Sequence, residues 1–298
     1  KHLVEKKVFE NNPLVIVDVG ARKGFEKHWD HYNNQSKLIG FEPNEDSYKE
    51  CVEHKSNEQT SYYPFALDIN KGEKDFYITS YLSACGFYKP DKKMVRKFGR
   101  EDTFEITDTV KVKTIDLDSF SNEYELTNID FIKLDTEGSE LDILKGAEET
   151  LKKSVLGLSI EVEFIQMYHD QPLFSEVDQY LRSLGFELYD LDLNRKARKT
   201  LAPYGSSNLD LGQLVQGQAL YLRDAVGELD TEKSKEFWHQ SKILKMASIQ
   251  EIFNLPDCAL ELLQKSQSLE IFEKADISIW TDLLAPNIDG KDISYKKY

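Results

Sequence analysis

Cysteine, positive charge and long apolar runs are all scarce in this 298-residue sequence. Its three cysteines, Cys51, Cys85 and Cys258, lie too far apart for the spacing of a metal site. No apolar run approaches the roughly 18 residues that a transmembrane helix requires, and no charged-then-apolar leader opens the chain. We therefore expect a cytoplasmic protein with reduced thiols and no membrane span.

Acidic residues outnumber basic residues, with 53 Asp and Glu against 38 Lys and Arg, which gives a formal net charge of −15. This balance argues against a nucleic-acid partner, because phosphate binding relies on clustered Lys and Arg. The densest basic stretch, "NRKARK" at 194–199, is typical of a solvated loop. The sequence starts with Lys rather than Met. The sequence leaves open whether the chain is part of a larger polypeptide and whether it forms a homo-oligomer.

Short apolar runs alternate with helical patterns from residue 14 onward. The sequence predicts strands at 14–20, 37–43, 62–68, 130–134 and 155–164, helices at 44–54 and 173–185, and a closing pair of strands at 186–193 and 217–224. A series of strand–helix–strand units that ends in a hairpin indicates an α/β fold. We expect a Rossmann-like, doubly wound, mostly parallel sheet with an antiparallel edge strand.

The pattern becomes helical beyond about residue 226, where "LPDCALELLQ" begins a helix at its proline. The predicted division is therefore a first domain at 1–225 and a helical C-terminal extension at 226–298.

The ends of the first three strands carry residues suited to a nucleoside. Asp18, Gly20 and Gly24 lie at the first strand-to-helix turn, where glycine allows a ligand to approach the backbone. Glu42 ends the second strand about 20 residues later, where an acid can bind ribose hydroxyls, and Asp68 ends the third. The spacing G-x-x-x-G differs from the dinucleotide fingerprint G-x-G-x-x-G.

Several stretches together resemble the FkbM-type methyltransferases, which are class I enzymes that use S-adenosylmethionine. They are "VIVDVGARKG", "LIGFEPN", "FALD", "VKTIDLDSF" and "IDFIKLDTEGSELDILKGAEETL". The resemblance covers residues 14 to about 224. It implies that the turn with Gly20, Ala21, Arg22 and Gly24 holds the methionine end of the donor, Glu42 its ribose, and Leu67 and Asp68 its adenine. Arg22-Lys23 departs from the smaller or polar residues expected there.

Asp135 follows the strand at 130–134, and Glu161 and Glu163 lie on one face of the next strand. Asp135 is expected at the buried end of its strand, whereas Glu137 and Glu140 suit the N-terminus of the following helix. Asp135 with Glu161 or Glu163 could coordinate a divalent metal ion such as magnesium. Alternatively, Asp135 orients the donor's ammonium group while Glu161 and Glu163 pair with Lys or Arg.

The resemblance implies methyl transfer to a hydroxyl, with a sugar or glycoconjugate as the acceptor. Asp135, Glu163 and the loop residue His169, the preferred base, are the predicted catalytic residues. Two alternatives are a nicotinamide-dependent oxidoreductase on a similar sheet and a non-catalytic donor-binding module that recruits a partner through its helical tail. Replacement of Gly20 by Val is expected to fill the donor's space and leave the sheet folded.

Overall fold

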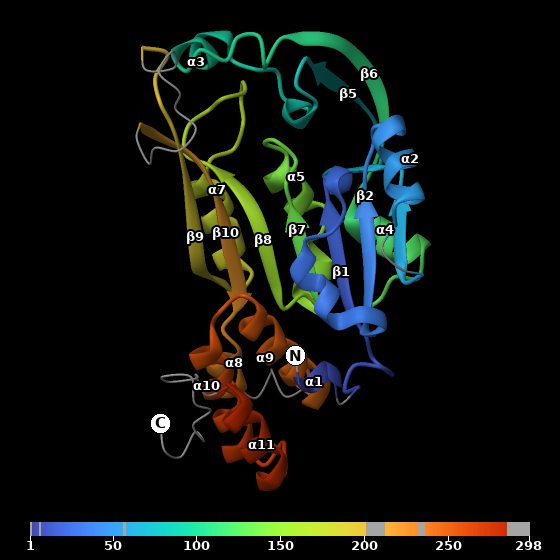
Figure 1. Ribbon diagram of the computed structural model, residues 1–298, viewed down its shortest axis with the longest axis vertical. Helices are drawn as coiled ribbons and strands as arrows, with labels where there is room; N and C mark the ends of the chain where they lie inside the picture. Colours follow the sequence, from blue (N-terminus) through green and yellow to red (C-terminus); the bar gives the residue numbers. More distant parts are fainter. Residues whose placement is uncertain (1, 6, 56–57, 201–211, 232–235, 285–298) are drawn as a thin grey trace. The chain divides into compact units, whose positions relative to one another are not determined.

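The computed structural model describes residues 2–5, 7–55, 58–200, 212–231 and 236–284 of the chain (Figure 1). Contacts between residues divide the chain into two compact units. One contains Val15–Phe25 and Leu38–Leu222, and the other contains the described parts of Lys1–Leu14, Glu26–Lys37 and Arg223–Tyr298. The helical C-terminal segment thus shares its unit with residues that the sequence analysis assigns to the first domain.

Seven strands form the main sheet, in the spatial order β3 (Thr60–Tyr63), β2 (Ser36–Phe41), β1 (Leu14–Val19), β7 (Phe131–Leu134), β8 (Gly157–Glu163), β10 (Gln213–Arg223) and β9 (Phe186–Lys196). The pairs β2–β3, β1–β7 and β7–β8 are parallel, whereas β10 is antiparallel to β8. The predicted mostly parallel sheet is confirmed. Its antiparallel strand lies between β8 and the edge strand β9.

A smaller sheet has the order β4 (Ala66–Leu67), β6 (Ile106–Ile115) and β5 (Gly72–Thr79). β5 and β6 pair antiparallel. The helices of this unit are η1 (Ala21–Lys23), α2 (Glu45–Glu53), η3 (Leu82–Ala84), α3 (Lys92–Lys97), α4 (Leu117–Glu123), α5 (Glu140–Lys145), α6 (Glu148–Lys153) and α7 (Phe174–Ser183).

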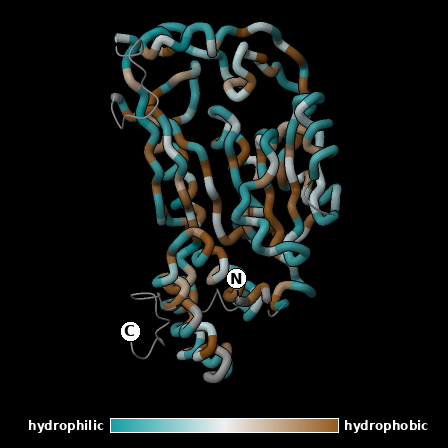
Figure 2. Tube along the Cα trace, viewed as in Figure 1, coloured by the Kyte–Doolittle hydropathy of each residue, from teal (hydrophilic) through white to brown (hydrophobic). Residues whose placement is uncertain are grey.

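Alternate residues of the main strands make one continuous hydrophobic core. Val15, Val17 and Val19 of β1 contribute to it, and every second residue of a strand faces the same side of a sheet. The same core includes Leu158, Ile160 and Val162 of β8, together with apolar side chains from α4, α5, α6 and α7. In Figure 2, hydrophobic residues follow the strands of this sheet. The opposite face of β8 is therefore left for Ser159, Glu161 and Glu163, as predicted.

The other unit contains α1 (His2–Glu5), η2 (Lys27–Gln35), α8 (Ala225–Leu229), α9 (Gln240–Ile252), α10 (Pro256–Ser268) and α11 (Lys274–Leu284). The helix predicted from Pro256 is confirmed, with the proline in its first turn. Lys245 is fully buried here, and its Nζ donates to Asn12 Oδ1 at 3.2 Å and to the carbonyl of Pro13 at 2.8 Å. Within the described residues, no helix combines the length and apolarity needed to cross a membrane.

Asp130 joins the starts of three central strands. It is fully buried, its Oδ2 accepts from the Val15 amide at 3.0 Å, and its own amide donates to the Val15 carbonyl at 2.8 Å. Its carbonyl accepts from the Leu156 and Gly157 amides at 2.9 and 3.4 Å. One residue thus sets the alignment of β1, β7 and β8 where they enter the sheet.

We predict that Asp130→Ala destabilises the protein by about 1–3 kcal/mol, because the buried Val15 amide loses its acceptor. Asp130→Asn, which keeps an acceptor oxygen, should lose less. Denaturant unfolding measures the change, and Asp102→Ala, at an exposed position, is the control. Equal stability of Asp130→Ala and Asp102→Ala would contradict this role.

Candidate functional site

A cavity of about 560 Å³ opens at the carboxyl ends of the parallel strands. It is lined by Gly20 after β1, Glu42 after β2, Leu67 of β4, Asp135 after β7 and Glu163 of β8. Ligands of open α/β sheets bind at this edge, and the volume suits a small molecule. The cavity lies within one compact unit and brings together most of the residues predicted from the sequence.

The turn after β1 requires glycine. Gly20 has φ of 84°, and a Cβ atom there would lie 2.1 Å from the carbonyl oxygen of Asp135. The Gly20 amide donates to the Phe41 carbonyl at 3.1 Å, which holds the turn against β2. Replacement by Val would therefore displace backbone as well as fill the donor's space. The expectation that Gly20→Val leaves the sheet intact is wrong.

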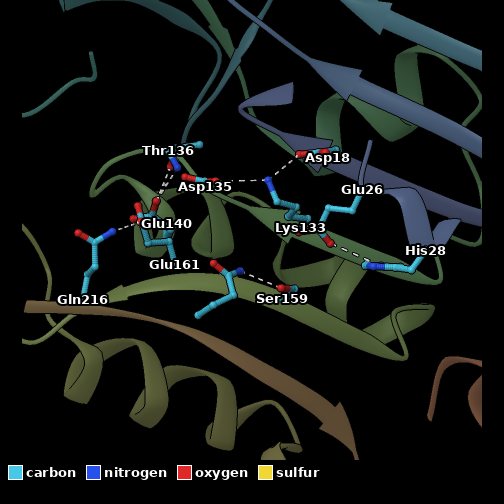
Figure 3. A network of polar contacts seen from close by, with 11 residues as sticks. Asp18, Glu26, His28, Lys133, Asp135, Thr136, Glu140, Ser159, Glu161 and Gln216 are labelled. Atoms are coloured by element: carbon cyan, nitrogen blue, oxygen red, sulfur yellow. Dashed lines mark hydrogen bonds and ion pairs between the residues drawn. The ribbon is translucent and has the colours of Figure 1, made fainter. Parts of the chain in front are cut away.

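Lys133 lies between two of the predicted acids (Figure 3). Its Nζ is 3.4 Å from Asp18 Oδ1 and 3.4 Å from Asp135 Oδ2. Asp18 is 2% exposed and does not line the cavity, whereas the Asp135 side chain is 44% exposed and does. The expected burial of Asp135 is therefore wrong, because the strand ends at the opening of the cavity. Asp18 acts on the site through Lys133.

The predicted donor residues divide into two groups. Gly20, Arg22, Gly24, Glu42 and Leu67 line the cavity, and Ala21 and Asp68 do not. Ala21 is 1% exposed within the core, and the Asp68 carboxylate is held by Lys74, with 3.1 Å between Nζ and Oδ1. The structure therefore gives no support for direct contact of Ala21 or Asp68 with a ligand.

Glu42 is the acid at the end of β2, and it is 5% exposed. Its Oε1 accepts from the Asn44 amide at 2.8 Å, which fixes the side chain. Burial raises the pKa of Glu42, while the Asn44 hydrogen bond and the nearby Arg22 guanidinium oppose that rise. A buried carboxyl group at this strand end suits an acceptor for ligand hydroxyls.

A row of polar side chains crosses from β8 to β10 on the face opposite the core. Gln218 Nε2 donates to Ser159 Oγ at 2.8 Å, and Gln216 Nε2 donates to Glu161 Oε1 (Figure 3). Glu161, Glu163 and Gln216 all line the cavity. The residue alternation that predicts this face of β8 is confirmed.

Glu137 is a residue of the site that sequence reasoning missed. Its backbone has φ of 57°, and its Oε2 accepts from the Tyr168 hydroxyl at 2.8 Å. Glu140, also expected at the helix N-terminus, does close the turn: it accepts from the Thr136 amide and hydroxyl and the Gly138 amide. Glu137 instead lines the cavity. The adjacent Gly138 is the sequence signal for such a turn.

Burial dominates the electrostatics of these carboxyl groups. It raises the pKa of Glu137 to about 8, against the opposing hydrogen bond from Tyr168, and Asp135 and Glu140 add to the rise. It raises the pKa of Glu163 to about 9, with further contributions from Glu137 and Glu140. The pKa of Glu161 is also well above its ordinary value, chiefly through burial. Near neutral pH this end of the cavity therefore favours protonated carboxyl groups.

The predicted base His169 does not line the cavity. His169 is exposed and outside the cavity, its amide bonded to the Lys89 carbonyl at 2.8 Å, whereas the neighbouring Tyr168 lines the cavity. The preference for His169 as the base is therefore not supported.

Among the described residues, no three His, Cys, Asp or Glu side chains are grouped closely enough to hold a metal ion. Asp135, Glu161 and Glu163 are thus not grouped as three ligands, and a metal held by Asp135 with one of the two glutamates stays a prediction.

Comparison with known proteins identifies a family for this chain. The family model "Methyltransferase FkbM domain" matches residues 18–188. No curated protein matches the chain.

Three solved methyltransferases are similar to this chain at low identity. An FkbM methyltransferase from Methylobacillus flagellatus is 14% identical with a TM-score of 0.39, and the match covers 70% of this chain and 43% of that chain. A putative S-adenosylmethionine-dependent methyltransferase from Listeria monocytogenes is 10% identical with a TM-score of 0.40, and the match covers 74% of this chain and 95% of that chain. Magnesium protoporphyrin IX methyltransferase from Synechocystis, with bound S-adenosylmethionine, is 10% identical with a TM-score of 0.35, and the match covers 74% of this chain and 76% of that chain.

The family match spans more than half of the 298 residues and includes the ends of β1, β2, β7 and β8 that line the cavity. On this basis the chain belongs to the FkbM family of S-adenosylmethionine-dependent methyltransferases.

Proposed function

We propose that this protein transfers a methyl group from S-adenosylmethionine to a hydroxyl group of a sugar or glycoconjugate. The observation that carries the proposal is a single cavity in which the glycine turn and Glu42 share walls with three carboxyl groups: Glu137, Glu161 and Glu163. The first part has the residues that a nucleoside donor needs. The second has carboxyl groups that, once ionised, can accept the proton of a hydroxyl.

The donor would lie over β2, β1 and β7. The turn with Gly20, Arg22 and Gly24 would hold its methionine end, Glu42 would accept from its ribose hydroxyls, and Leu67 would contact adenine. Asp135, which is accessible at the end of β7, is placed to accept from the donor's ammonium group. The positions of Gly20, Glu42 and Asp135 at the ends of the neighbouring strands β1, β2 and β7 support these roles.

Methyl transfer needs an oxygen nucleophile and a proton acceptor. The acceptor oxygen attacks the sulfonium methyl carbon, a C–O bond forms, and the sulfur keeps the electron pair of the broken C–S bond. The hydroxyl proton passes to a carboxylate, and such general bases typically contribute about 10²–10⁴-fold.

Glu137 is the better candidate for this base than the predicted Glu163. The Tyr168 hydroxyl donates to Glu137 Oε2 at 2.8 Å and stabilises the ionised form, whereas Glu163 Oε2 has no hydrogen-bond partner among the described residues. The proposal assigns no step to His169, which lies outside the cavity, or to magnesium, whose expected ligands are not grouped.

The direct test is a screen of sugars, activated sugars and glycolipids with donor carrying a labelled methyl group. Label transferred to an acceptor oxygen supports the proposal. Donor binding without transfer to any acceptor would favour a non-catalytic binding module. Transfer to nitrogen or carbon would retain the methyltransferase and overturn the hydroxyl acceptor.

Glu42→Ala should weaken S-adenosylmethionine and its demethylated product S-adenosylhomocysteine alike, since both carry the ribose. The loss of a hydrogen bond to a charged group costs about 1.5–3 kcal/mol, or about 10- to 100-fold in Kd. Isothermal calorimetry measures both affinities. Glu53→Ala, exposed on α2, should bind like wild type, and wild-type affinity in Glu42→Ala would remove the ribose contact.

Glu137→Gln should lower kcat/KM by about 10²–10⁴-fold. In the wild type, kcat/KM should rise with pH through about 8, as the Glu137 carboxyl group loses its proton. The rise should be absent in Glu137→Gln. Tyr168→Phe should move it to higher pH, because the Tyr168 hydrogen bond lowers the Glu137 pKa. An unchanged profile in Glu137→Gln would identify another base.

The same raised pKa predicts how stability depends on pH. Below the ordinary pKa of 4.5, the Glu137 carboxyl is protonated in both the folded and the unfolded chain and has no differential effect. Between 4.5 and about 8 only the unfolded chain loses the proton, so wild-type stability falls as pH rises. The Tm of Glu137→Gln relative to wild type should therefore increase from pH 4 to pH 9. A constant difference would contradict the raised pKa.

A further inference from the structure

Two carboxylate oxygens at the β8 side of the cavity are buried without a hydrogen bond. Glu161 Oε2 and Glu163 Oε2 have no partner within the described residues. Glu163 is 5% exposed, and both residues line the cavity. Buried polar atoms are ordinarily hydrogen-bonded, so two such atoms on neighbouring positions of one strand face point to a ligand that donates.

The side chains around these atoms offer few donors. The Tyr168 hydroxyl is directed to Glu137, and Gln216 Nε2 to Glu161 Oε1. The six oxygens of Glu137, Glu161 and Glu163 therefore outnumber the hydrogen bonds that the described residues direct to them. A ligand seated here must bring donors of its own.

The local charge is also unbalanced. Asp135 and Glu140 add to the negative potential at Glu161, together with Glu137 and Glu163. Two cations, Lys196 and Arg100, also line the cavity, and the half-buried Lys196 interacts electrostatically with all three carboxyl groups. A ligand cation would favour the ionised form of these acids and offset the repulsion that ionisation creates among them.

We infer that the acceptor carries a protonated amino group, which binds between Glu161 and Glu163 and presents a neighbouring hydroxyl to the donor. The acceptor is then an amino sugar or a similar amino alcohol. This inference rests on the proposed function and narrows its substrate class.

An ammonium group fits these observations better than a neutral hydroxyl. Its three N–H groups can reach both unpartnered oxygens, and charged hydrogen bonds are stronger than neutral ones. A hydroxyl could satisfy one oxygen but, having no charge, would not favour the ionised form of these acids. The aromatic residues Phe98, Phe104 and Tyr168 line the same cavity and suit the apolar face of a sugar ring.

The test uses the full-length protein saturated with S-adenosylhomocysteine. Calorimetry compares glucosamine with glucose and N-acetylglucosamine, and galactosamine with galactose and N-acetylgalactosamine. In at least one set the free amine should bind about 10- to 100-fold more tightly, as expected for a charged hydrogen bond. Equal or weaker binding of the amine in every set overturns the inference.

Glu163→Gln and Glu161→Gln should each remove most of this preference, whereas Glu187→Gln, exposed on β9, should keep it. Circular dichroism checks folding, and Glu161→Gln carries the test if Glu163→Gln fails to fold. A preference retained in both folded variants overturns the assignment. So does a Glu163→Gln variant that binds S-adenosylmethionine weakly but S-adenosylhomocysteine normally, because the acids would then face the donor's sulfonium.

The experiment separates this inference from the proposed function. If neither S-adenosylmethionine nor S-adenosylhomocysteine binds, the proposed function fails and the acceptor assignment fails with it. If the donor binds and its methyl group passes to the hydroxyl of a neutral sugar with no preference for amines, the function stands and only the amine assignment is overturned.

Discussion

The close approach of two backbone segments, at Gly20 and Asp135, is the constraint on which the site depends. The Asp135 amide donates to the Val19 carbonyl at 3.2 Å, and the Gly20 amide donates to the Phe41 carbonyl at 3.1 Å. These bonds bring the ends of β1, β2 and β7 to one level and leave no room for a Cβ atom at residue 20. Glu42 and Asp135 therefore open into the same cavity although they lie 93 positions apart in the sequence.

The second constraint is electrostatic. A strand in the middle of a sheet that carries acids on one face would be costly if those acids were charged and enclosed. The fold lowers this cost by favouring the protonated form of Glu161 and Glu163. Lys133 compensates a different pair, Asp18 and Asp135. The cavity consequently has one side where Lys133 partly offsets two acids, and a second side where protonation of the carboxyl groups adds to the effect of Lys196.

The sequence predicts the sheet and several strand-end residues of the cavity wall because strand ends and residue alternation are local patterns. Gly20, Glu42 and Glu163 follow from them. It does not predict that Asp68 is held by Lys74, since that contact joins residues on either side of a turn. Nor does the sequence predict that Tyr168, and not His169, lines the cavity. The backbone conformation of the loop decides which of these two adjacent side chains faces inward.

Glu137 was missed for a related reason. Glutamate just before a helix ordinarily indicates a favourable charge at the N-terminus. Here the left-handed backbone at residue 137 turns the side chain away from that position and towards the cavity, where the Tyr168 hydroxyl meets it.

The antiparallel insertion of β10 has a consequence for how such a protein could diversify. Lys196 of β9 and Gln216 of β10 line the cavity, yet both lie beyond residue 188, where the family match ends. The wall that faces the donor is thus encoded within the shared segment, and part of the opposite wall is encoded by a separate hairpin. Exchange of that hairpin alone would change what the cavity selects while the cofactor-binding turn stays intact. The part of selectivity that depends on Lys196 and Gln216 is therefore encoded apart from the glycine turn and from Glu137.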